Sequence, residues 1–297
     1  MPGSSTALIE TRLSEAGLDV GDVRELVDRA LAEDLDGGID VTSVATVPVD
    51  QQGALDLVAR AAGVVAGIPI AAAVFDRVGD GRVTIDMEAS DGSAVRPGEV
   101  LMTATGPVRE LLLAERTALN LLCHLSGIAT ATQQWVSALG STVTRVRDTR
   151  KTTPGLRRLE KYAVRCGGGV NHRMSLSDAA LVKDNHIVAA GGVAQAFRAV
   201  RAMAPDIPLE VEVDSLDQLE EVLEAGADLV LLDNFTPEQM SEAVRRTAGR
   251  ARLEASGGLT LESARAVGAT GVDFVAVGAL THSAPVLDIG ADLRELP

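Results

Sequence analysis

The sequence predicts an α/β protein, in which a partial α/β barrel of about six strands follows an N-terminal α+β domain with an open sheet. Six short runs rich in Val, Leu and Ile occur between residues 142 and 278, and helical patterns separate most of them. Apolar strands joined by crossover helices form parallel sheets that are covered on both faces. In the first half, strand-like runs follow one another without long helices between them, which indicates antiparallel pairing.

The N-terminal domain is expected over residues 1–126. Residues 20–34 have the apolar spacing of an amphipathic helix. Strand-like runs follow, interrupted by turns such as VRPGE, at residues 53–60, 83–88 and 100–105. A long helical run over residues 108–125 then leads into the second domain, which is expected over residues 127–297.

The barrel strands are expected where each apolar run ends in a polar residue or a glycine. These runs are residues 142–148, 179–184, 209–214, 227–233, 251–256 and 272–278, and the clearest helices between them are residues 192–204, 216–225, 237–248 and 261–267. The spacing of roughly 20–25 residues favours a closed or nearly closed barrel over an open sheet. A complete barrel needs eight strands and about 250 residues, so a partial one is expected.

Composition excludes several classes of protein. The formal charge is −15 and aromatic residues make up 2% of the chain, which argues against nucleic-acid binding, since this needs an extended basic surface and stacking platforms. The first residues lack the basic start and apolar run of a signal peptide, and no window is apolar for the length of a membrane span. Cys123 and Cys166 show no metal-ligand or redox spacing. We therefore expect a cytoplasmic protein that does not bind membranes.

A local inversion of charge stands out against this acidic background. Residues 145–173 contain nine Lys or Arg side chains but only Asp148 and Glu160 as acids. The core of the run is residues 148–157 (DTRKTTPGLR), and it ends in the glycine-rich residues 166–173 (CGGGVNHR). A solvated surface face is the alternative explanation. A concave site lined with cations concentrates anions, so we favour a binding site for a small polyanion.

The predicted strand ends bring further chemistry to the same edge of the barrel, where catalytic groups of such folds lie. Lys183 closes an apolar strand and needs an anion, either Asp184 or a ligand, unless it extends to water. Glu212 and Asp233 end the next two strands, where they could hold Mg²⁺ or sugar hydroxyls; Asp233 could equally cap a helix. The last two ends carry glycine-rich loops suited to phosphate.

One polar stripe runs along the otherwise apolar residues 108–125. Arg116, Asn120 and His124 recur every four residues and therefore share one helix face. The pattern fits a solvated edge and a ligand-facing strip equally well.

Several motifs together resemble the quinolinate phosphoribosyltransferases (carboxylating nicotinate-nucleotide pyrophosphorylases), a family of type II phosphoribosyltransferases. The resemblance runs from about residue 20 to the end of the chain and covers both halves in family order. The motifs are RTALN (116–120), SGIAT (126–130), DTRKTTPGLR (148–157), GGVNHR (168–173), KDNH (183–186), EVE (210–212), LDN (232–234), EASGG (254–258) and VGALT (277–281).

The resemblance implies a reaction of quinolinate with phosphoribosyl pyrophosphate that gives nicotinate mononucleotide, pyrophosphate and CO₂ in NAD biosynthesis. It implies quinolinate binding by Arg116, Thr149, Arg150, His172, Arg173 and Lys183. It implies phosphoribosyl pyrophosphate binding by Lys151, Glu212, Asp233, Ser256, Gly257, Gly258, Gly278, Ala279 and His282. Lys151, Glu212 and Asp233 are the expected catalytic residues, and Glu212 and Asp233 are also expected to bind Mg²⁺. Arg116 is expected to reach the site of a neighbouring subunit, so a homodimer or higher homo-oligomer is expected.

Three alternatives remain on sequence alone. A paralogue associated with molybdate transport shares the barrel, but a full set of carboxylate-binding residues argues against it. A non-catalytic phosphate or nucleotide sensor would not need Glu212 and Asp233. An enzyme that uses nicotinate would need fewer cations, because that ring has one carboxylate.

Overall fold

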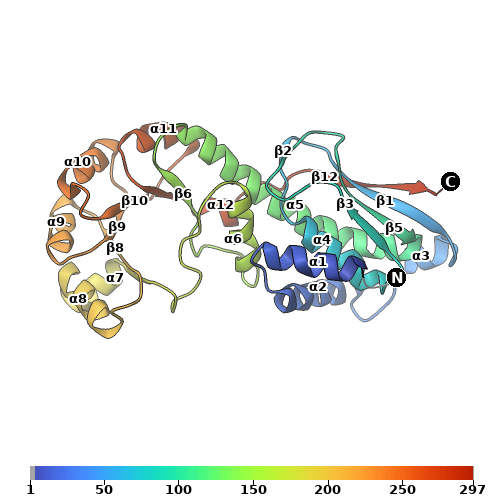
Figure 1. Ribbon diagram of the computed structural model, residues 1–297. Helices are drawn as coiled ribbons and strands as arrows, with labels where there is room; N and C mark the ends of the chain where they lie inside the picture. The colour runs from blue at the N-terminus through green and yellow to red at the C-terminus, as the bar shows by residue number, and fades with distance from the viewer. Residues whose placement is uncertain (1–3, 297) are drawn as a thin grey trace. The chain divides into compact units, whose positions relative to one another are not determined.

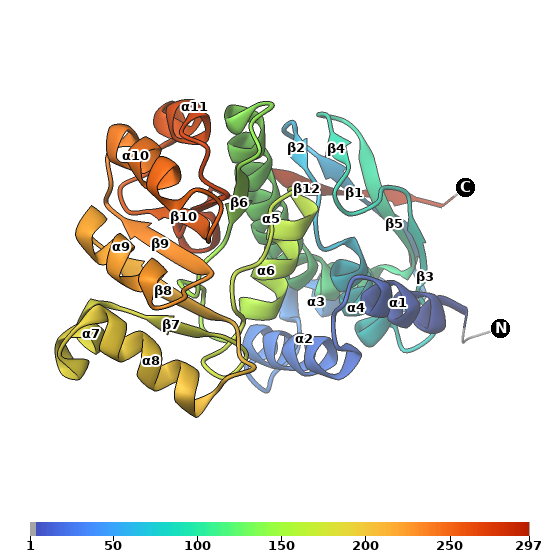
Figure 2. The same cartoon turned by 60° about the vertical axis from the view of Figure 1, so that its left-hand side comes forward.

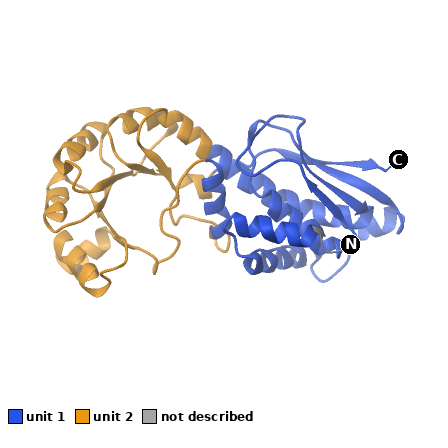
Figure 3. Cartoon of the chain, in the orientation of Figure 1, with its two compact units in different colours: residues 1–131, 158–167, 284–297 blue, residues 132–157, 168–283 orange. Residues whose placement is uncertain are grey.

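A computed structural model describes residues 4–296, which form two compact units. Unit 1 comprises residues 4–131, 158–167 and 284–296, and unit 2 comprises residues 132–157 and 168–283 (Figure 3). The predicted domain boundary at residues 126 and 127 lies inside one continuous helix, α5 (Val108–Leu139). The last strand of the chain returns to unit 1, so neither unit is a single stretch of sequence.

Unit 1 contains a four-stranded sheet in the order β12-β1-β5-β3. All three neighbouring pairs are antiparallel, as predicted for this half of the chain. The strands are β1 (Gln52–Ala59), β3 (Thr84–Met87), β5 (Val100–Pro107) and β12 (Ile289–Glu295), and a separate small pair is formed by β2 (Gly63–Val64) and β4 (Ala94–Val95). Prediction found β1, β3 and β5 but missed β12, whose sequence alternates weakly and is exposed over its second half.

Helices accompany this sheet, and polar side chains fix where several of them begin. The predicted helix at residues 20–34 is α2 (Val20–Leu35), which starts where the side chain of Asp19 accepts a hydrogen bond from the backbone N–H of Asp22. Three further helices were not predicted, namely α1 (Ser4–Glu15), α3 (Val41–Thr46) and α4 (Ile68–Gly79). α4 has no cap from its own N-cap residue, Gly67, and the distant Asp91 accepts hydrogen bonds from the N–H groups of Gly67 and Ile68 instead.

Unit 2 is a parallel six-stranded sheet in the order β6-β11-β10-β9-β8-β7 (Figures 1 and 2). Its strands are β6 (Arg145–Arg147), β7 (Ala180–Val182), β8 (Leu209–Val213), β9 (Leu229–Asp233), β10 (Arg252–Ser256) and β11 (Phe274–Ala276). All six lie within the predicted runs. β6 and β7 are the edge strands, and Val170 forms a parallel bridge to Arg147 beside β6. The prediction of a partial barrel of about six strands is therefore confirmed.

Helices surround the outer side of this curved sheet (Figure 2). They are α7 (Asp184–Ala190), α8 (Val193–Met203), α9 (Leu216–Glu224), α10 (Pro237–Thr247) and α11 (Leu261–Ala269). The short α12 (Ala279–His282) follows β11. The four longest were predicted within a few residues, because each has a clear apolar face with buried residues against the sheet. The competing role of Asp233 or Asn234 as a helix cap was wrong, since Thr236 caps α10.

The basic segment divides between the two units. Its helix α6 (Arg157–Cys166) places residues 158–167 in unit 1, where Glu160 contacts His124 at 2.9 Å and Tyr162 donates to Asp91 at 2.6 Å. The charge of the segment suggested one continuous anion site, but its residues are divided between the two units. His124, on the polar stripe of α5, has an internal carboxylate partner, whereas Arg116 and Asn120 are exposed.

Candidate active site

The carboxyl ends of the barrel strands enclose a pocket of about 410 Å³, a size typical of sites for small molecules. All of its lining residues belong to unit 2. Polar members come from the ends of β6, β7, β8, β9 and β10 or from the loops that follow, as expected where parallel strands end together. They are Thr149, Arg150, Lys151, His172, Arg173, Lys183, Glu212, Asp233, Glu254, Ser256 and Gly257.

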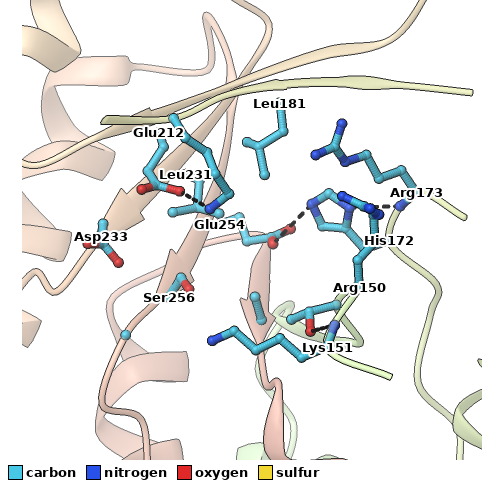
Figure 4. Close-up of a pocket in the computed structure, with 14 residues that line it drawn as sticks. Arg150, Lys151, His172, Arg173, Leu181, Glu212, Leu231, Asp233, Glu254 and Ser256 are labelled. Carbon is cyan, nitrogen blue, oxygen red and sulfur yellow. Dashed lines mark hydrogen bonds and ion pairs between the residues drawn. The ribbon is translucent and has the colours of Figure 1, made fainter. Parts of the chain in front are cut away.

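The cations come from loops that are tied together internally. The hydroxyl of Thr149 accepts a hydrogen bond from the N–H of Lys151 at 3.0 Å, which turns the chain directly after β6. Arg157 donates to Thr152 and to the carbonyl of Met174, and so joins this loop to the one that carries Arg173. In Figure 4, Arg150 and Arg173 lie on one side of the pocket, and Glu212 and Asp233 lie on the other.

Arg150 and Arg173 form a positively charged wall. Burial and, secondarily, the positive charge of Arg150 lower the pKa of Arg173. The Nε atom of Arg150 is buried without a hydrogen-bond partner within the described part of the chain. The repulsion between the two arginines and the unpaired Nε of Arg150 favour an anionic ligand between them, since a bound carboxylate would relieve both costs.

The opposite wall carries carboxylates on two neighbouring strands. Lys183 Nζ lies 2.7 Å from Glu212 Oε2, so the anion that Lys183 needed is Glu212 rather than Asp184. Asp233 accepts a hydrogen bond from the side chain of Asn234 at 2.7 Å. Asn234 has a positive φ of 56°, and its N–H donates to the carbonyl of Ser256. These contacts hold the ends of β9 and β10 together at the pocket.

Two glycines beside the pocket lie close against other side chains. Gly257 has a φ of +89°, and a Cβ atom there would lie 2.2 Å from the side chain of Asn234. A Cβ atom at Gly278 would lie 2.9 Å from Cδ of Lys151 and 3.6 Å from Nε2 of His282. Lys151 therefore crosses closely over the backbone of Gly278, and Thr281 fixes the same approach by donating to the carbonyl of Lys151 at 2.7 Å.

A layer of buried charges forms the bottom of the pocket, and two of its members, His172 and Glu254, line the cavity. We call Arg147, His172, Glu210 and Glu254 the floor, and we call Arg150, Lys151, Lys183 and Asp233 the rim. Arg147 forms an ion pair with Glu254 and lies 4.0 Å from Glu210, and His172 Nε2 lies 2.6 Å from Glu210 Oε2. Burial, reinforced by the charge of Glu210, raises the pKa of Glu254 to about 8. Burial therefore favours the protonated form of Glu254, against the attraction of Arg147.

The site residues that the sequence predicted fall into three groups. Ten of them line the pocket together: Thr149, Arg150, Lys151, His172, Arg173, Lys183, Glu212, Asp233, Ser256 and Gly257. Gly278 and His282 lie beside Lys151, as described above, and Gly258 and Ala279 directly follow Gly257 and Gly278 in the chain. Arg116 lies in unit 1 and is exposed.

Prediction placed His172 at the site but gave no role to the other three residues of the floor. Glu210 and Glu254 stand two residues before Glu212 and Ser256 and share their faces of the strands, a relation that strand alternation shows in the sequence. Arg147 was noted only as part of the basic segment, and its pairing with Glu254 across the sheet was not visible in the sequence.

A barrel whose strand ends combine arginines, carboxylates and glycine-rich loops fits an enzyme that acts on a phosphorylated, anionic substrate. The family models agree along the chain. The C-terminal domain of quinolinate phosphoribosyl transferase matches residues 128–292, and the N-terminal domain of the same family matches residues 40–126. This chain belongs to the quinolinate phosphoribosyltransferase family.

Individual relatives cover nearly the whole chain. A nicotinate-nucleotide pyrophosphorylase [carboxylating] from Mycobacterium leprae is 52% identical over 285 residues, which are 95% of this chain and 100% of that protein. A probable enzyme of the same name from Bacillus subtilis is 41% identical and covers 91% and 93% of the two chains. The crystal structure of NadC from Streptococcus pyogenes superposes with a TM-score of 0.90 at 42% identity, over 94% of this chain and 99% of that one.

Proposed function

We propose that the barrel pocket is the active site for the reaction of quinolinate with phosphoribosyl pyrophosphate. The enzyme transfers the phosphoribosyl group to quinolinate with decarboxylation, giving nicotinate mononucleotide, pyrophosphate and CO₂ in de novo NAD biosynthesis. One observation carries the assignment to this pocket: an arginine wall faces a carboxylate wall across a single cavity, with glycine-rich backbone beside it. The pocket thus offers separate places for a dicarboxylate and for a phosphorylated sugar.

Quinolinate binds at the arginine wall. Arg150 and Arg173 pair with its carboxylates, because the guanidinium fork matches a carboxylate in two parallel hydrogen bonds. Thr149 and Lys183 complete this clamp, with Lys183 shared between the substrate and Glu212. His172, also expected at the clamp, lies next to Arg173 with its ring hydrogen-bonded to protein groups.

Phosphoribosyl pyrophosphate binds along the opposite side. Lys151 extends over Gly278 and can neutralise phosphate charge. Exposed N–H groups and side chains of the two last strand ends hold the 5′-phosphate; these are Ser256, Gly257, Gly258, Gly278, Ala279 and His282. Glu212 and Asp233 then face the ribose and accept hydrogen bonds from its hydroxyls.

We also propose Mg²⁺ as the cofactor, held by Glu212 and Asp233. The donor set fits, because Mg²⁺ prefers oxygen ligands and usually combines one or two carboxylates with water and substrate phosphates. When bound, the ion would neutralise charge on the departing pyrophosphate. The ion pair with Lys183 holds the side chain of Glu212 in place until substrates and metal bind.

The protein residues then act mainly by positioning and electrostatics. As the pyridine nitrogen forms its bond to the anomeric carbon, the bond to pyrophosphate breaks, and Glu212 and Asp233 stabilise the positive charge that develops on the ribose. Lys151 stabilises the negative charge on the leaving group. When the bond between C2 and the carboxylate breaks and CO₂ departs, the electron pair stays at C2, where the adjacent positive ring nitrogen stabilises it. A proton added at C2 then completes the nicotinate ring.

We propose further that the enzyme works in the cytoplasm as a homodimer or larger homo-oligomer, in which Arg116 of one subunit serves the pocket of another. Two features support self-association. Arg116 is exposed on α5, and unit 1 also exposes Ile39, Val41 and Val49, which are each more than 60% accessible. Both cysteines are free thiols, which suits a reducing compartment.

The direct test is to measure CO₂ and nicotinate mononucleotide from quinolinate, phosphoribosyl pyrophosphate and Mg²⁺, with nicotinate as substrate in parallel. Turnover of quinolinate alone supports the proposal. Turnover of nicotinate without CO₂ release would contradict it, and inactivity of folded protein with both acids would favour the molybdate-associated paralogue or a sensor.

A mixing experiment tests the shared site. Arg116→Ala and Lys151→Ala variants are each expected to be nearly inactive, and mixed subunits should regain partial activity because one hybrid site keeps both side chains. The control is mass spectrometry that demonstrates subunit exchange. Exchange without recovered activity would rule out a role for Arg116 across subunits.

A further inference from the structure

The hydrogen bonds of His172 determine which of its ring nitrogens can act on a ligand. Its Nδ1 accepts a hydrogen bond from the backbone N–H of Arg173 at 2.7 Å. A nitrogen that accepts from an N–H group must carry a lone pair, so the proton of the ring is on Nε2. Nε2 lies 2.6 Å from Glu210 Oε2 and donates to it. Both nitrogens of the ring are therefore engaged by the protein.

The surroundings of the ring keep this arrangement in place. The side chains of His172 and Glu210 are 8% and 3% exposed, so water does not compete for their hydrogen bond. The backbone N–H of His172 donates to Asp148 at 2.8 Å, and the side chain of Asn171 donates to the same carboxylate. The residue is thus fixed through its backbone at the end of β6 and through its ring at β8.

Arg147 makes a metal ion at this cluster unnecessary. His172, Glu210 and Glu254 place one ligand atom each within 4.8 Å of one another, which is a spacing that could hold a cation. The guanidinium of Arg147 already pairs with Glu254 and lies 4.0 Å from Glu210. One arginine lies beside two carboxylates, and burial favours the protonated form of Glu254. The negative charge of the cluster is therefore balanced by the protein itself.

We propose that His172 is a positioning residue that links Glu210 to Arg173, rather than a direct ligand of the substrate. Glu210 fixes the ring through Nε2, and the ring fixes the start of the Arg173 loop through Nδ1. Arg173 is held on its other side by a hydrogen bond from its guanidinium to the carbonyl of Ala179 at 2.9 Å. The two anchors together set the direction in which its remaining N–H groups face the pocket. The inference rests on the proposed function, in which Arg173 binds a quinolinate carboxylate.

The state of the ring can be measured without an activity assay. Full-length protein with ¹⁵N-labelled histidine rings, compared with a His172→Asn variant for assignment, should show His172 as the neutral form protonated at Nε2. Saturation with quinolinate, followed independently by calorimetry, should leave both ring nitrogen signals in that form. A ring protonated at Nδ1 in the free protein, or converted on quinolinate binding, would overturn the proposal. Absence of calorimetric binding would instead count against the proposed function, while the free-state spectrum still tests the inference.

Matched substitutions give a second test. The side-chain oxygen of Asn can take the place of Nδ1, so His172→Asn should raise the KM for quinolinate by only about threefold, whereas His172→Leu should raise it about tenfold or more, the effect of one lost hydrogen bond. The KM for phosphoribosyl pyrophosphate should change less than about twofold in both. Equal damage by Asn and Leu would show that the substrate needs Nε2. If His172→Leu does not fold, His172→Gln replaces it, since its amide reaches Nε2 but not Nδ1.

The contribution of Glu210 is tested in the same assay. Glu210→Gln keeps an oxygen for the ring but removes its charge, and it should raise the KM for quinolinate several-fold, about threefold to tenfold. The matched control is Glu224→Gln, which changes an exposed carboxylate at the end of α9 and should have no effect. An equal rise in the KM for phosphoribosyl pyrophosphate would contradict the link to Arg173.

Discussion

The floor and the rim of the pocket carry similar charges but differ in how those charges are satisfied. On the floor, the side chains of Glu254 and Arg147 are 0% and 13% exposed and pair with each other. On the rim, Lys183 is 47% exposed although it pairs with Glu212. A buried ion pair loses much of its stability when one partner is removed, whereas an exposed side chain can exchange its partner at little cost. The comparison indicates that the floor holds the site together and that the rim is available to substrates.

Removal of Arg147 should have the largest effect. Arg147→Ala leaves the carboxylates of the floor without their cation, and we expect it to lower the free energy of unfolding by about 3–5 kcal/mol. Chemical denaturation would measure this. Arg252→Ala is the control, because Arg252 also lies over the ring of Phe274 but is exposed. A loss of the same size in both variants would mean that the aromatic contact, and not the floor, stabilises the barrel.

Removal of Lys151 should separate activity from stability. Lys151→Ala is expected to lower kcat by about 10²–10³, as is typical when a single preorganised group that stabilises transition-state charge is lost. Its unfolding midpoint should stay close to that of the wild type, because Lys151 is exposed. Arg145→Ala changes an exposed cation at the start of β6, away from the pocket, and should keep full activity. Comparable losses of activity in both variants would show that the overall positive charge, and not the position of Lys151, is responsible for the effect.

Lys183 tests whether the rim distinguishes the two substrates. Lys183→Ala should raise the KM for quinolinate about tenfold and that for phosphoribosyl pyrophosphate much less, because the lost charge belongs to the quinolinate clamp. Steady-state kinetics with each substrate varied in turn gives the answer. Arg198→Ala, on the exposed side of α8, is the control. Equal effects on both KM values would place Lys183 with Glu212 at the phosphoribosyl side.

The last prediction concerns the proton on Glu254 and the dependence of stability on pH. Its pKa is raised from 4.5 to about 8 in the folded protein, so the unfolded chain releases this proton first as pH increases. The group therefore costs the wild type stability between about pH 4.5 and pH 8. Glu254→Gln should lose less stability over this range than the wild type, by about 1.4 kcal/mol for each unit by which the pKa of Glu254 is raised. Unfolding midpoints measured near pH 5 and pH 8 that decrease in parallel would show that Glu254 is ionised in the folded state.

Strand patterns allowed most of unit 2 to be predicted. Apolar runs such as residues 229–233 bury their three central side chains, which point to alternate faces of the sheet, so local composition carried the information. Unit 1 was harder, because its elements depend on distant partners. α4 begins where Asp91 accepts its first N–H groups, and β12 pairs with β1 across more than 230 residues of sequence. Neither partner is visible in the local sequence of α4 or β12.

By itself, the sequence determined which residues can form the rim, because strand ends in a parallel barrel meet at one edge whatever the details of packing. The structure determined everything that depends on a partner from another strand or helix. Lys183 joins Glu212, His124 joins Glu160, and Arg147 joins Glu254 beneath the pocket. The sequence shows which charged side chains each strand end carries. Burial in the folded protein decides whether such a side chain is paired internally or stays exposed and able to bind a substrate.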